Sequence, residues 1–280
     1  AWDVADKNIL IIGFGRIGRN IFRLGYDNPR YNFVAISDFG SLEALHYLLM
    51  RDSVHGSMKD EVTLDGNYLK VKDQKVRVIS GGQPGTIPWD IYDVDIVIDA
   101  TGRFLKKSDL SMHLDSGAKK VFTTRNPQEK IDRYVIPGIN EETIKPEDKV
   151  VSTTSSTTQV LALMVKMLDE KFGLERAMMT TVHAYTADQP LADAAGIDLR
   201  RSRSAAENII PNTTTAPEII QQIMPKFKGK IDGIAFNVPV PNGSCVDLTT
   251  QLMKTPTIDE ANEAIKDYAK NSLNGIVGYT

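Results

Sequence analysis

The 280-residue sequence contains a single cysteine, Cys245. One thiol excludes an internal disulfide and a metal cluster built on cysteines. We expect Cys245, in the stretch "NGSCVDLT", to be a small buried residue of a strand, and the alternative is a reactive thiol. The four histidines are scattered and form no HExxH motif or paired spacing, so the sequence predicts no metal site.

The chain also has no strong excess of one charge and no long hydrophobic run. It contains 33 basic and 36 acidic residues, with a formal net charge of -3. We therefore expect neither nucleic acid nor membrane as a partner. Apolar runs such as "NILIIG" are far shorter than the about 18 residues of a membrane span, and "AWDVADK" has no signal-peptide pattern. The expected location is the cytoplasm.

The first half of the chain alternates short β-rich runs with helical patterns, which is typical of a parallel sheet with crossover helices. Strands are predicted over residues 8–12, 32–37, 95–100 and 119–124, and the stretch 68–80 alternates like an exposed antiparallel pair. We predict a doubly wound α/β domain over residues 1–152.

The second half changes character, and we predict a second domain over residues 153–280 for the substrate. A helix over 155–171 precedes long strand patterns at 177–186, 233–238 and 244–253, with a polar, arginine-rich loop over 186–208. A last helix over 258–272 follows the capping residue Thr257. Long strands with few crossovers predict an α+β domain with a mostly antiparallel sheet.

The stretch "GFGRIG" matches the dinucleotide-binding pattern GxGxxG and lies directly after a predicted strand. Gly13 permits a tight turn, Gly15 lets the backbone approach a pyrophosphate, and Gly18 lets helix and strand pack closely. Arg16 and Ile17 complete the predicted cofactor-binding turn. A purely structural turn is the weaker alternative.

An acidic residue follows at the spacing that a Rossmann domain requires. Asp38 ends the next strand, where a carboxylate can accept hydrogen bonds from a ribose 2'-hydroxyl. Since a carboxylate repels a 2'-phosphate, NAD is favoured over NADP. Further along, "DATGRF" places Thr101 and Gly102 at the carboxyl end of a later strand, where open sheets of this kind bind ligands.

These residues belong to a longer series of motifs through which the chain resembles glyceraldehyde-3-phosphate dehydrogenase along nearly its whole length. The resemblance implies a homotetramer that oxidises a triose phosphate with NAD. In that family a cysteine thiolate, activated by a histidine, adds to the aldehyde, hydride leaves to NAD, and phosphate releases the acyl group. The matching pieces, in the family's order, are "IGFGRIGRNIFR", "LLMRDSVHG", "IDATGRF", "GAKKVF", "MMTTVHAYTADQ", "DLRRSRSAAENIIP", "KGKIDGIAFNVPVPN" and "VDLT".

The resemblance assigns roles to individual positions of this sequence. Ser156 stands at the place of the nucleophile and His183 at that of the activating histidine. The remaining positions are Thr157 beside the nucleophile, Thr124 near the nicotinamide, and Thr186, Arg201 and Thr214 as phosphate ligands.

The chain departs from the family pattern at the same site. It has "SSTTQ" where the family has Ser-Cys-Thr-Thr-Asn, so Ser156 replaces the cysteine and Gln159 the asparagine. A serine hydroxyl needs a well-placed base, and an oxygen ester is a poorer acyl donor than a thioester, so activity should fall by several orders of magnitude. Asn237 stands where the family has its second phosphate-binding arginine, and Thr215 replaces a glycine.

The sequence leaves three functional hypotheses open. The first is an NAD-dependent aldehyde dehydrogenase of the family's type, weakly active or inactive because of Ser156. The second is a non-catalytic, regulatory or structural NAD-binding protein. The third is an oxidoreductase of an unphosphorylated aldehyde or alcohol, with His183 as base and Ser156 as hydrogen-bond donor. Because the family continues beyond "GIVGYT" with further strands and a helix, we also expect an incomplete second sheet.

Overall fold

The computed structural model describes residues 7–81 and 83–280. The stretch "AWDVAD", on which the expectation about a signal peptide rests, lies outside these residues. By its contacts the chain divides into two compact units, one of Ala1–Tyr134 with Ile144–Thr154 and one of Val135–Thr143 with Ser155–Thr280. Each unit has its own sheet and is described by itself.

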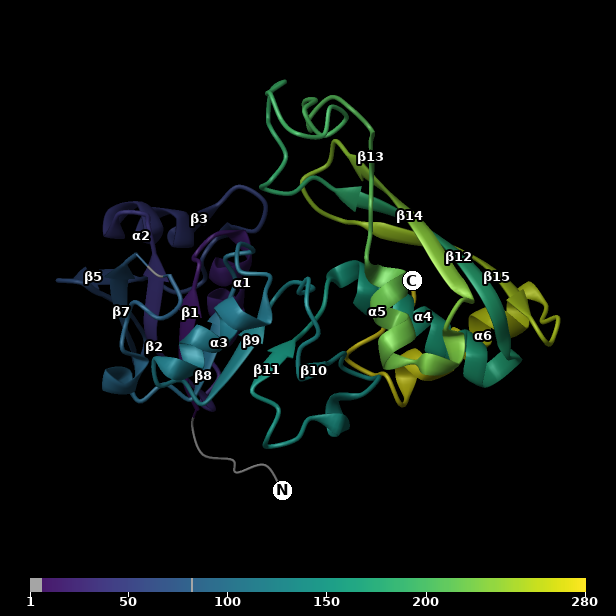
Figure 1. Ribbon diagram of the computed structural model, residues 1–280, viewed down its shortest axis with the longest axis horizontal. Coiled ribbons are helices and arrows are strands. Elements are labelled where there is room, and N and C mark those ends of the chain that lie inside the picture. The colour runs from purple at the N-terminus through teal and green to yellow at the C-terminus, as the bar shows by residue number, and fades with distance from the viewer. Residues whose placement is uncertain (1–6, 82) are drawn as a thin grey trace. The chain divides into compact units, whose positions relative to one another are not determined.

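The first unit is built on a nine-stranded sheet with the strand order β10-β11-β9-β8-β1-β2-β7-β6-β5 (Figure 1). Pairing is parallel from β10 to β7, and antiparallel between β7, β6 and β5. The elements are β1 (Lys7–Ile12), α1 (Arg16–Gly25), β2 (Tyr31–Asp38), α2 (Leu42–Met50), β3 (Arg51–Asp52), β4 (Gly56–Ser57), β5 (Thr63–Asp65), β6 (Tyr68–Val71), β7 (Gln74–Ser80), the 3-10 helix η1 (Trp89–Tyr92), β8 (Ile96–Asp99), α3 (Lys107–Asp115), β9 (Lys120–Thr123), β10 (Arg133–Tyr134) and β11 (Val150–Ser152).

Strand β1 shows why its apolar run folds in this way. Its residues alternate between the two faces of the sheet, and both faces are covered. Ile9 and Ile11 pack with side chains from α1 and α2, whereas Leu10 and Ile12 pack with Trp89 of η1 and with α3. Helices on both faces of a mainly parallel sheet confirm the predicted doubly wound fold.

The predicted antiparallel pair over residues 68–80 is present as β6 and β7, but it is not an exposed hairpin. β7 pairs in parallel with β2, so the pair extends the main sheet. Leu69 and Val76 are completely buried. The prediction of exposure was wrong because one face of the pair packs in the same core as α1 and α2.

The second unit has a four-stranded sheet with the order β13-β14-β12-β15. β12 pairs in parallel with β14, whereas the pairs β12/β15 and β13/β14 are antiparallel, so the sheet is mostly antiparallel as predicted. Apolar residues of α4 and α5 share one core with β12 and β14. The elements are the 3-10 helix η2 (Glu141–Thr143), α4 (Ser156–Phe172), β12 (Leu174–Ala184), β13 (Ile210–Asn212), α5 (Ala216–Ile223), the 3-10 helix η3 (Pro225–Phe227), β14 (Ile231–Val238), β15 (Cys245–Leu252) and α6 (Ile258–Lys270).

Two expectations about this unit have opposite outcomes. Helix α6 starts with a complete capping box, in which Thr257 accepts a hydrogen bond from Glu260 N and the Glu260 carboxylate accepts one from Thr257 N. Cys245 is the first residue of β15, as expected, but it is exposed, so the expectation of burial was wrong.

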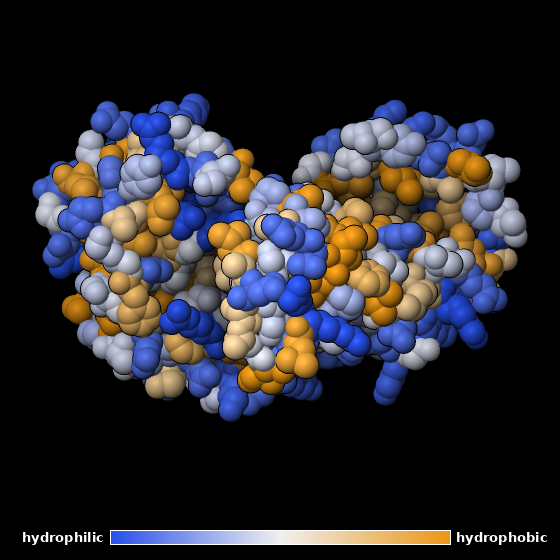
Figure 2. Space-filling view, turned by 90° about the horizontal axis from the view of Figure 1, so that it is seen from above, coloured by the Kyte–Doolittle hydropathy of each residue, from blue (hydrophilic) through white to orange (hydrophobic). Residues whose placement is uncertain are grey.

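The surface of the chain carries hydrophobic residues scattered among hydrophilic ones, as Figure 2 shows for one face. Within the arginine-rich loop, which was predicted to be polar, Leu191, Ile197 and Leu199 are strongly exposed. Among the residues described, helices are too short or too polar to cross a bilayer.

Candidate functional site

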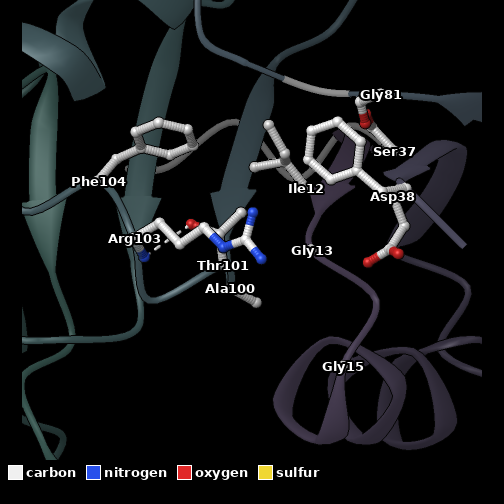
Figure 3. Close-up of a pocket in the computed structure, with 11 residues that line it drawn as sticks. Ile12, Gly13, Gly15, Ser37, Asp38, Gly81, Ala100, Thr101, Arg103 and Phe104 are labelled. Carbon is white, nitrogen blue, oxygen red and sulfur yellow. Dashed lines mark hydrogen bonds between the residues drawn. The ribbon is translucent and has the colours of Figure 1, made fainter. Parts of the chain in front are cut away.

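A pocket of about 210 Å³ opens at the carboxyl ends of β1, β2 and β8. At this point the strand order reverses, because β2 lies on one side of β1 and β8 on the other. Such a switch point is where doubly wound sheets bind ligands. The pocket is lined by Ile12, Gly13, Gly15, Ser37, Asp38, Phe39, Gly81, Ala100, Thr101, Arg103 and Phe104 (Figure 3).

The three glycines of "GFGRIG" have different surroundings. Gly13 has φ +83°, and a Cβ there would lie 2.7 Å from Thr101 N. A Cβ at Gly18 would lie 2.1 Å from Gly13 O, so helix α1 and the turn touch at this position. A Cβ at Gly15 would meet no atom of the described residues within 4 Å, its two chain neighbours apart. Gly13 and Gly18 are therefore required by packing, whereas Gly15 leaves open space at the pocket.

The open space at Gly15 fits a pyrophosphate. Gly15 is the N-cap residue of α1 and has no side chain that could occupy the backbone N–H groups of the first helical turn. These groups and the positive end of the helix dipole favour an anion. The local geometry therefore suits the phosphates of a dinucleotide.

Asp38 connects the glycine turn to the end of β2. Its Oδ2 accepts a hydrogen bond of 2.7 Å from Phe14 N, and its Oδ1 accepts one of 2.9 Å from Gly40 N. Each oxygen retains a second lone pair that can accept a ribose hydroxyl. The strand-end position of Asp38 predicts a ribose contact but gives no sign of this second role, in which the carboxylate holds the turn in place.

The opposite side of the pocket is formed by the turn after β8. Thr101 lines the pocket and accepts a 3.1 Å hydrogen bond from Arg103 N through its hydroxyl. The Arg103 guanidinium lies 5.8 Å from the centre of the Phe39 ring, which is within cation–π distance. In Figure 3 Asp38 and Arg103 lie on either side of the Gly13 turn.

Part of this lining was not among the predicted site residues. Arg103 and Phe104 follow Thr101 directly in "DATGRF", and this motif was the available signal for them. Ser37 and Gly81 are joined by a hydrogen bond of 2.6 Å across 44 positions, for which the sequence offers no signal.

Other predicted cofactor residues lie outside the lining of the pocket. Thr124 donates hydrogen bonds to the Asp99 carbonyl through N and Oγ1, at 3.1 and 3.3 Å. Gly102 accepts one from the Arg125 guanidinium at 3.2 Å. The roles of these residues in cofactor binding stay predictions, as do those of Arg16, Ile17 and Gly18.

In the second unit, topology brings two of the predicted catalytic positions to one end. Helix α4 begins at Ser156 and is joined through Gly173 to β12, which runs back along it. The helix spans about 24 Å and the strand reaches His183 after about 30 Å. The start of α4 and the far end of β12 therefore lie at the same end of this unit.

At the start of α4, two neighbouring serines differ in their surroundings. The Ser155 hydroxyl accepts a 3.2 Å hydrogen bond from Thr158 N and caps the helix. Ser156 is exposed, whereas Thr157 is buried. The helix N-terminus favours negative charge on an atom bound there, which suits an oxygen or sulfur nucleophile.

The ring of His183 is oriented by its own backbone neighbour. Its Nδ1 lies 2.6 Å from Ala184 O. Because a carbonyl oxygen can only accept, Nδ1 carries the proton in this contact. The Nε2 atom of the neutral ring then holds the lone pair that a general base needs.

The predicted phosphate ligands fall into two groups. Both the Thr186 hydroxyl and the Arg201 guanidinium lie against Asp188, the latter at 3.9 Å. The carboxylate of Asp188 therefore lies beside both side chains, as a bound anion would. Thr214 lies apart from this contact, where its Oγ1 accepts a 3.2 Å hydrogen bond from Ala216 N at the start of α5.

Asn237 is buried, and both the oxygen and the nitrogen of its side-chain amide are hydrogen-bonded. Its Oδ1 accepts a 3.0 Å hydrogen bond from Asn212, and its Nδ2 donates to Gln189 Oε1.

No group of three or more His, Cys, Asp or Glu side chains suited to a metal ion occurs within residues 7–81 and 83–280.

Both halves of the chain match domains of the same family of known proteins. Residues 7–107 match the NAD binding domain of glyceraldehyde 3-phosphate dehydrogenase, and residues 155–280 match its C-terminal domain. The chain is 44% identical to glyceraldehyde-3-phosphate dehydrogenase of Geobacillus stearothermophilus over 271 residues, which is 96% of this chain and 81% of that protein. For glyceraldehyde-3-phosphate dehydrogenase 1 of Bacillus subtilis the identity is 43%, with the same coverage. The matched domain indicates NAD as the cofactor.

Proposed function

Because the chain belongs to the glyceraldehyde-3-phosphate dehydrogenase family, we propose that it is an NAD-linked dehydrogenase of triose phosphate whose turnover is weak or absent with Ser156 at the nucleophile position. The observation that carries the proposal is the pocket in which the Gly13–Gly15 turn, Asp38 and Thr101 meet at the switch point of the sheet. The NAD held there would supply a hydride acceptor.

The remaining chemistry is assigned to residues of the second unit. His183, with its lone pair on Nε2, removes the proton from the nucleophile at position 156 as that atom adds to the aldehyde carbon. Thr186 and Arg201 bind the phosphate, which displaces Asp188 from them. The NAD would take up the hydride that the adduct loses on becoming an acyl group, and inorganic phosphate then releases this acyl group from residue 156.

The proposal accounts for weak turnover through the chemistry of the nucleophile. A serine hydroxyl is almost wholly protonated at neutral pH, whereas a cysteine is partly ionised even without help. His183 therefore has to deprotonate the serine without a side chain that orients its ring, because its Nδ1 contacts only a backbone carbonyl among the contacts described. The acyl ester formed on serine also transfers less readily to phosphate.

The test is NAD reduction with glyceraldehyde 3-phosphate and inorganic phosphate, measured side by side on the wild type and on Ser156→Cys. We expect the variant to gain at least about a thousandfold in kcat/KM. A double variant with His183→Ala should lose most of this gain. If both proteins stay silent while NAD still binds, the triose phosphate proposal fails and a non-catalytic NAD-binding role takes its place.

A second candidate function is the oxidation or reduction of an unphosphorylated aldehyde or alcohol. It is favoured by Asn237, a neutral, buried side chain at the position where the family resemblance places an arginine. In this version His183 is the base for direct hydride transfer, and Ser156 donates a hydrogen bond to the substrate oxygen. A screen of small aldehydes and alcohols with NAD and NADH, negative throughout, would remove it.

Assembly as a homotetramer and a cytoplasmic location belong to the same proposal and rest on the family resemblance. Light scattering of the purified chain tests the assembly. A monomeric mass would contradict it.

A further inference from the structure

Three polar side chains lie in the interior of the first unit behind the turn that follows β8. They are Trp89 of η1, Asp99 at the end of β8 and His113 in the last turn of α3, each at most 1% exposed. They do not line the dinucleotide pocket. Because burying such groups destabilises a fold unless they are paired, their arrangement calls for an explanation.

The hydrogen bond between Trp89 and His113 fixes the tautomer of the histidine. The indole Nε1 lies 3.1 Å from His113 Nδ1. An indole N–H can only donate, so Nδ1 must hold a lone pair and the proton of the neutral ring lies on Nε2. That Nε2 lies 3.6 Å from Asp99 Oδ2. Both atoms are buried, and each is without a hydrogen-bond partner among the described residues. The N–H group of His113 therefore faces the carboxylate.

The other oxygen of Asp99 holds the turn of the pocket. Asp99 Oδ1 accepts hydrogen bonds from Thr101 N at 3.0 Å and from Thr101 Oγ1 at 2.7 Å. The Thr101 hydroxyl in turn accepts from Arg103 N. A continuous series of contacts thus runs from Trp89 through His113 and Asp99 to Thr101 and Arg103, the last two of which line the pocket.

We infer that His113 is a positioning residue for the dinucleotide site, which it orders through Asp99 without touching the cofactor. The inference rests on the proposed NAD binding of this pocket. If the N–H group of His113 were absent, Asp99 Oδ2 would face an apolar interior. The carboxylate would then rotate towards another donor, and this change would weaken its two bonds to Thr101.

Thr101 tolerates little displacement. Its backbone N would lie only 2.7 Å from a Cβ at Gly13, so the two turns of the pocket are in close contact. A shift of Thr101 would therefore also disturb the glycine turn against which it packs. We expect the effect of His113 to be seen in the affinity for NAD.

The experiment compares NAD binding by calorimetry in the wild type and two variants of His113. His113→Phe keeps a ring of similar volume and removes the N–H donor, and it should weaken NAD binding at least about tenfold. His113→Gln keeps an N–H donor at a similar distance from the backbone, and it should restore most of the affinity. The matched control is Leu110→Ala, one turn earlier in α3 and completely buried, which should lower Tm and leave the affinity unchanged.

A spectroscopic measurement on the wild type provides a second readout. The ¹⁵N shifts of the His113 ring should show a bare Nδ1 and a protonated Nε2. Asp99→Asn can place an amide N–H opposite the N–H of His113 Nε2. Because Trp89 donates to Nδ1 and excludes the other tautomer, the two donors would face each other, which should weaken NAD binding. If His113→Phe does not fold, this variant and these shifts carry the test.

The outcomes separate the inference from the proposed function. If the wild type binds NAD and the foldable variants bind it equally well, His113 is merely structural and the inference is overturned. If the wild type itself does not bind NAD, the proposed function fails and the inference fails with it. Weakened binding in His113→Phe that His113→Gln restores supports both.

Discussion

His183 and Asn237 lie directly beside each other on the parallel strands β12 and β14. Residues in register on neighbouring strands project from the same face of the sheet. Here that face is the one on which Met179, four positions before His183, and Ala235, two positions before Asn237, are buried. The base of the proposed reaction therefore has an uncharged amide as its neighbour.

This neighbourhood predicts the effect of a positive charge at position 237. In a Ser156→Cys background, Asn237→Arg should lower KM for glyceraldehyde 3-phosphate by about tenfold or more, since a charge-assisted contact contributes about 1.5 to 3 kcal/mol. The measurement is steady-state kinetics with triose phosphate varied. The control is Asn237→Gln, which stays neutral and should bring no gain. An unchanged KM in the arginine variant would show that position 237 does not face the phosphate.

Two glycines of the cofactor turn should respond differently to the same substitution. Gly18→Ala forces a Cβ to within 2.1 Å of Gly13 O, so it should lower the free energy of unfolding and abolish NAD binding together. Gly15→Ala has open space and a backbone φ of -73°, so it should leave stability unchanged and weaken NAD binding. Thermal unfolding and NAD titration check both. Equal stability losses in the two variants would contradict this account.

The charge of Asp38 should set the choice between the two dinucleotides. Asp38→Ala removes the acceptor for Phe14 N and the proposed acceptor for the ribose hydroxyls, so affinity for NAD should fall. Affinity for NADP should fall less, because the repulsion of its 2'-phosphate is also lost. Separate titrations with NAD and NADP measure the ratio. Glu43→Gln is the control, since Glu43 is an acidic residue in the first turn of α2 that does not line the pocket. The ratio of NAD to NADP affinity in this variant should equal that of the wild type.

Acid should destabilise the first unit through Asp52. The backbone N–H of His55 and, less strongly, that of Val54 lower the pKa of this carboxyl from 3.8 to about 2. Because the folded pKa lies below the unfolded one, the stabilisation is fully present above pH 3.8 and is lost as the pH falls towards 2. It amounts to about 2 kcal/mol.

Denaturant titrations of the wild type and Asp52→Asn at several pH values test this effect. The difference in free energy of unfolding between them should be constant near neutral pH and should shrink as the pH falls below 4. If the difference does not change with pH, the substitution acts through the shape of the side chain at position 52 and not through its charge.

The sequence predicted well those helices and strands that are marked by a pattern of neighbouring residues. β1, β2, β8 and β9 are apolar runs buried in the sheet, and α6 begins at a capping box that is visible in "TIDE". The exposure of Cys245 was mispredicted because β15 is at the edge of its sheet. The local residues of an edge strand do not determine what covers them.

The site was predictable only where motif and strand end coincide. Gly13, Gly15, Asp38 and Thr101 all line the pocket, and glycine spacing and strand ends are the local signals that predict them; their roles in cofactor binding stay predictions. The contact of His113 with Asp99 depends on which face of β8 meets α3, and this was not evident from the sequence. The hydrogen bond from Ser37 to Gly81 depends on the pairing of β2 with β7, which is equally non-local.

The unequal surroundings of the glycines also determine what evolution can reveal about this chain. Positions 13 and 18 are sterically closed, so descendants that had abandoned nucleotides altogether would still be held to glycine there by folding alone. No described residue closes position 15, so in such a lineage it would drift freely. Residue 15, and not the motif as a whole, is therefore the historical marker of whether selection for the cofactor has continued.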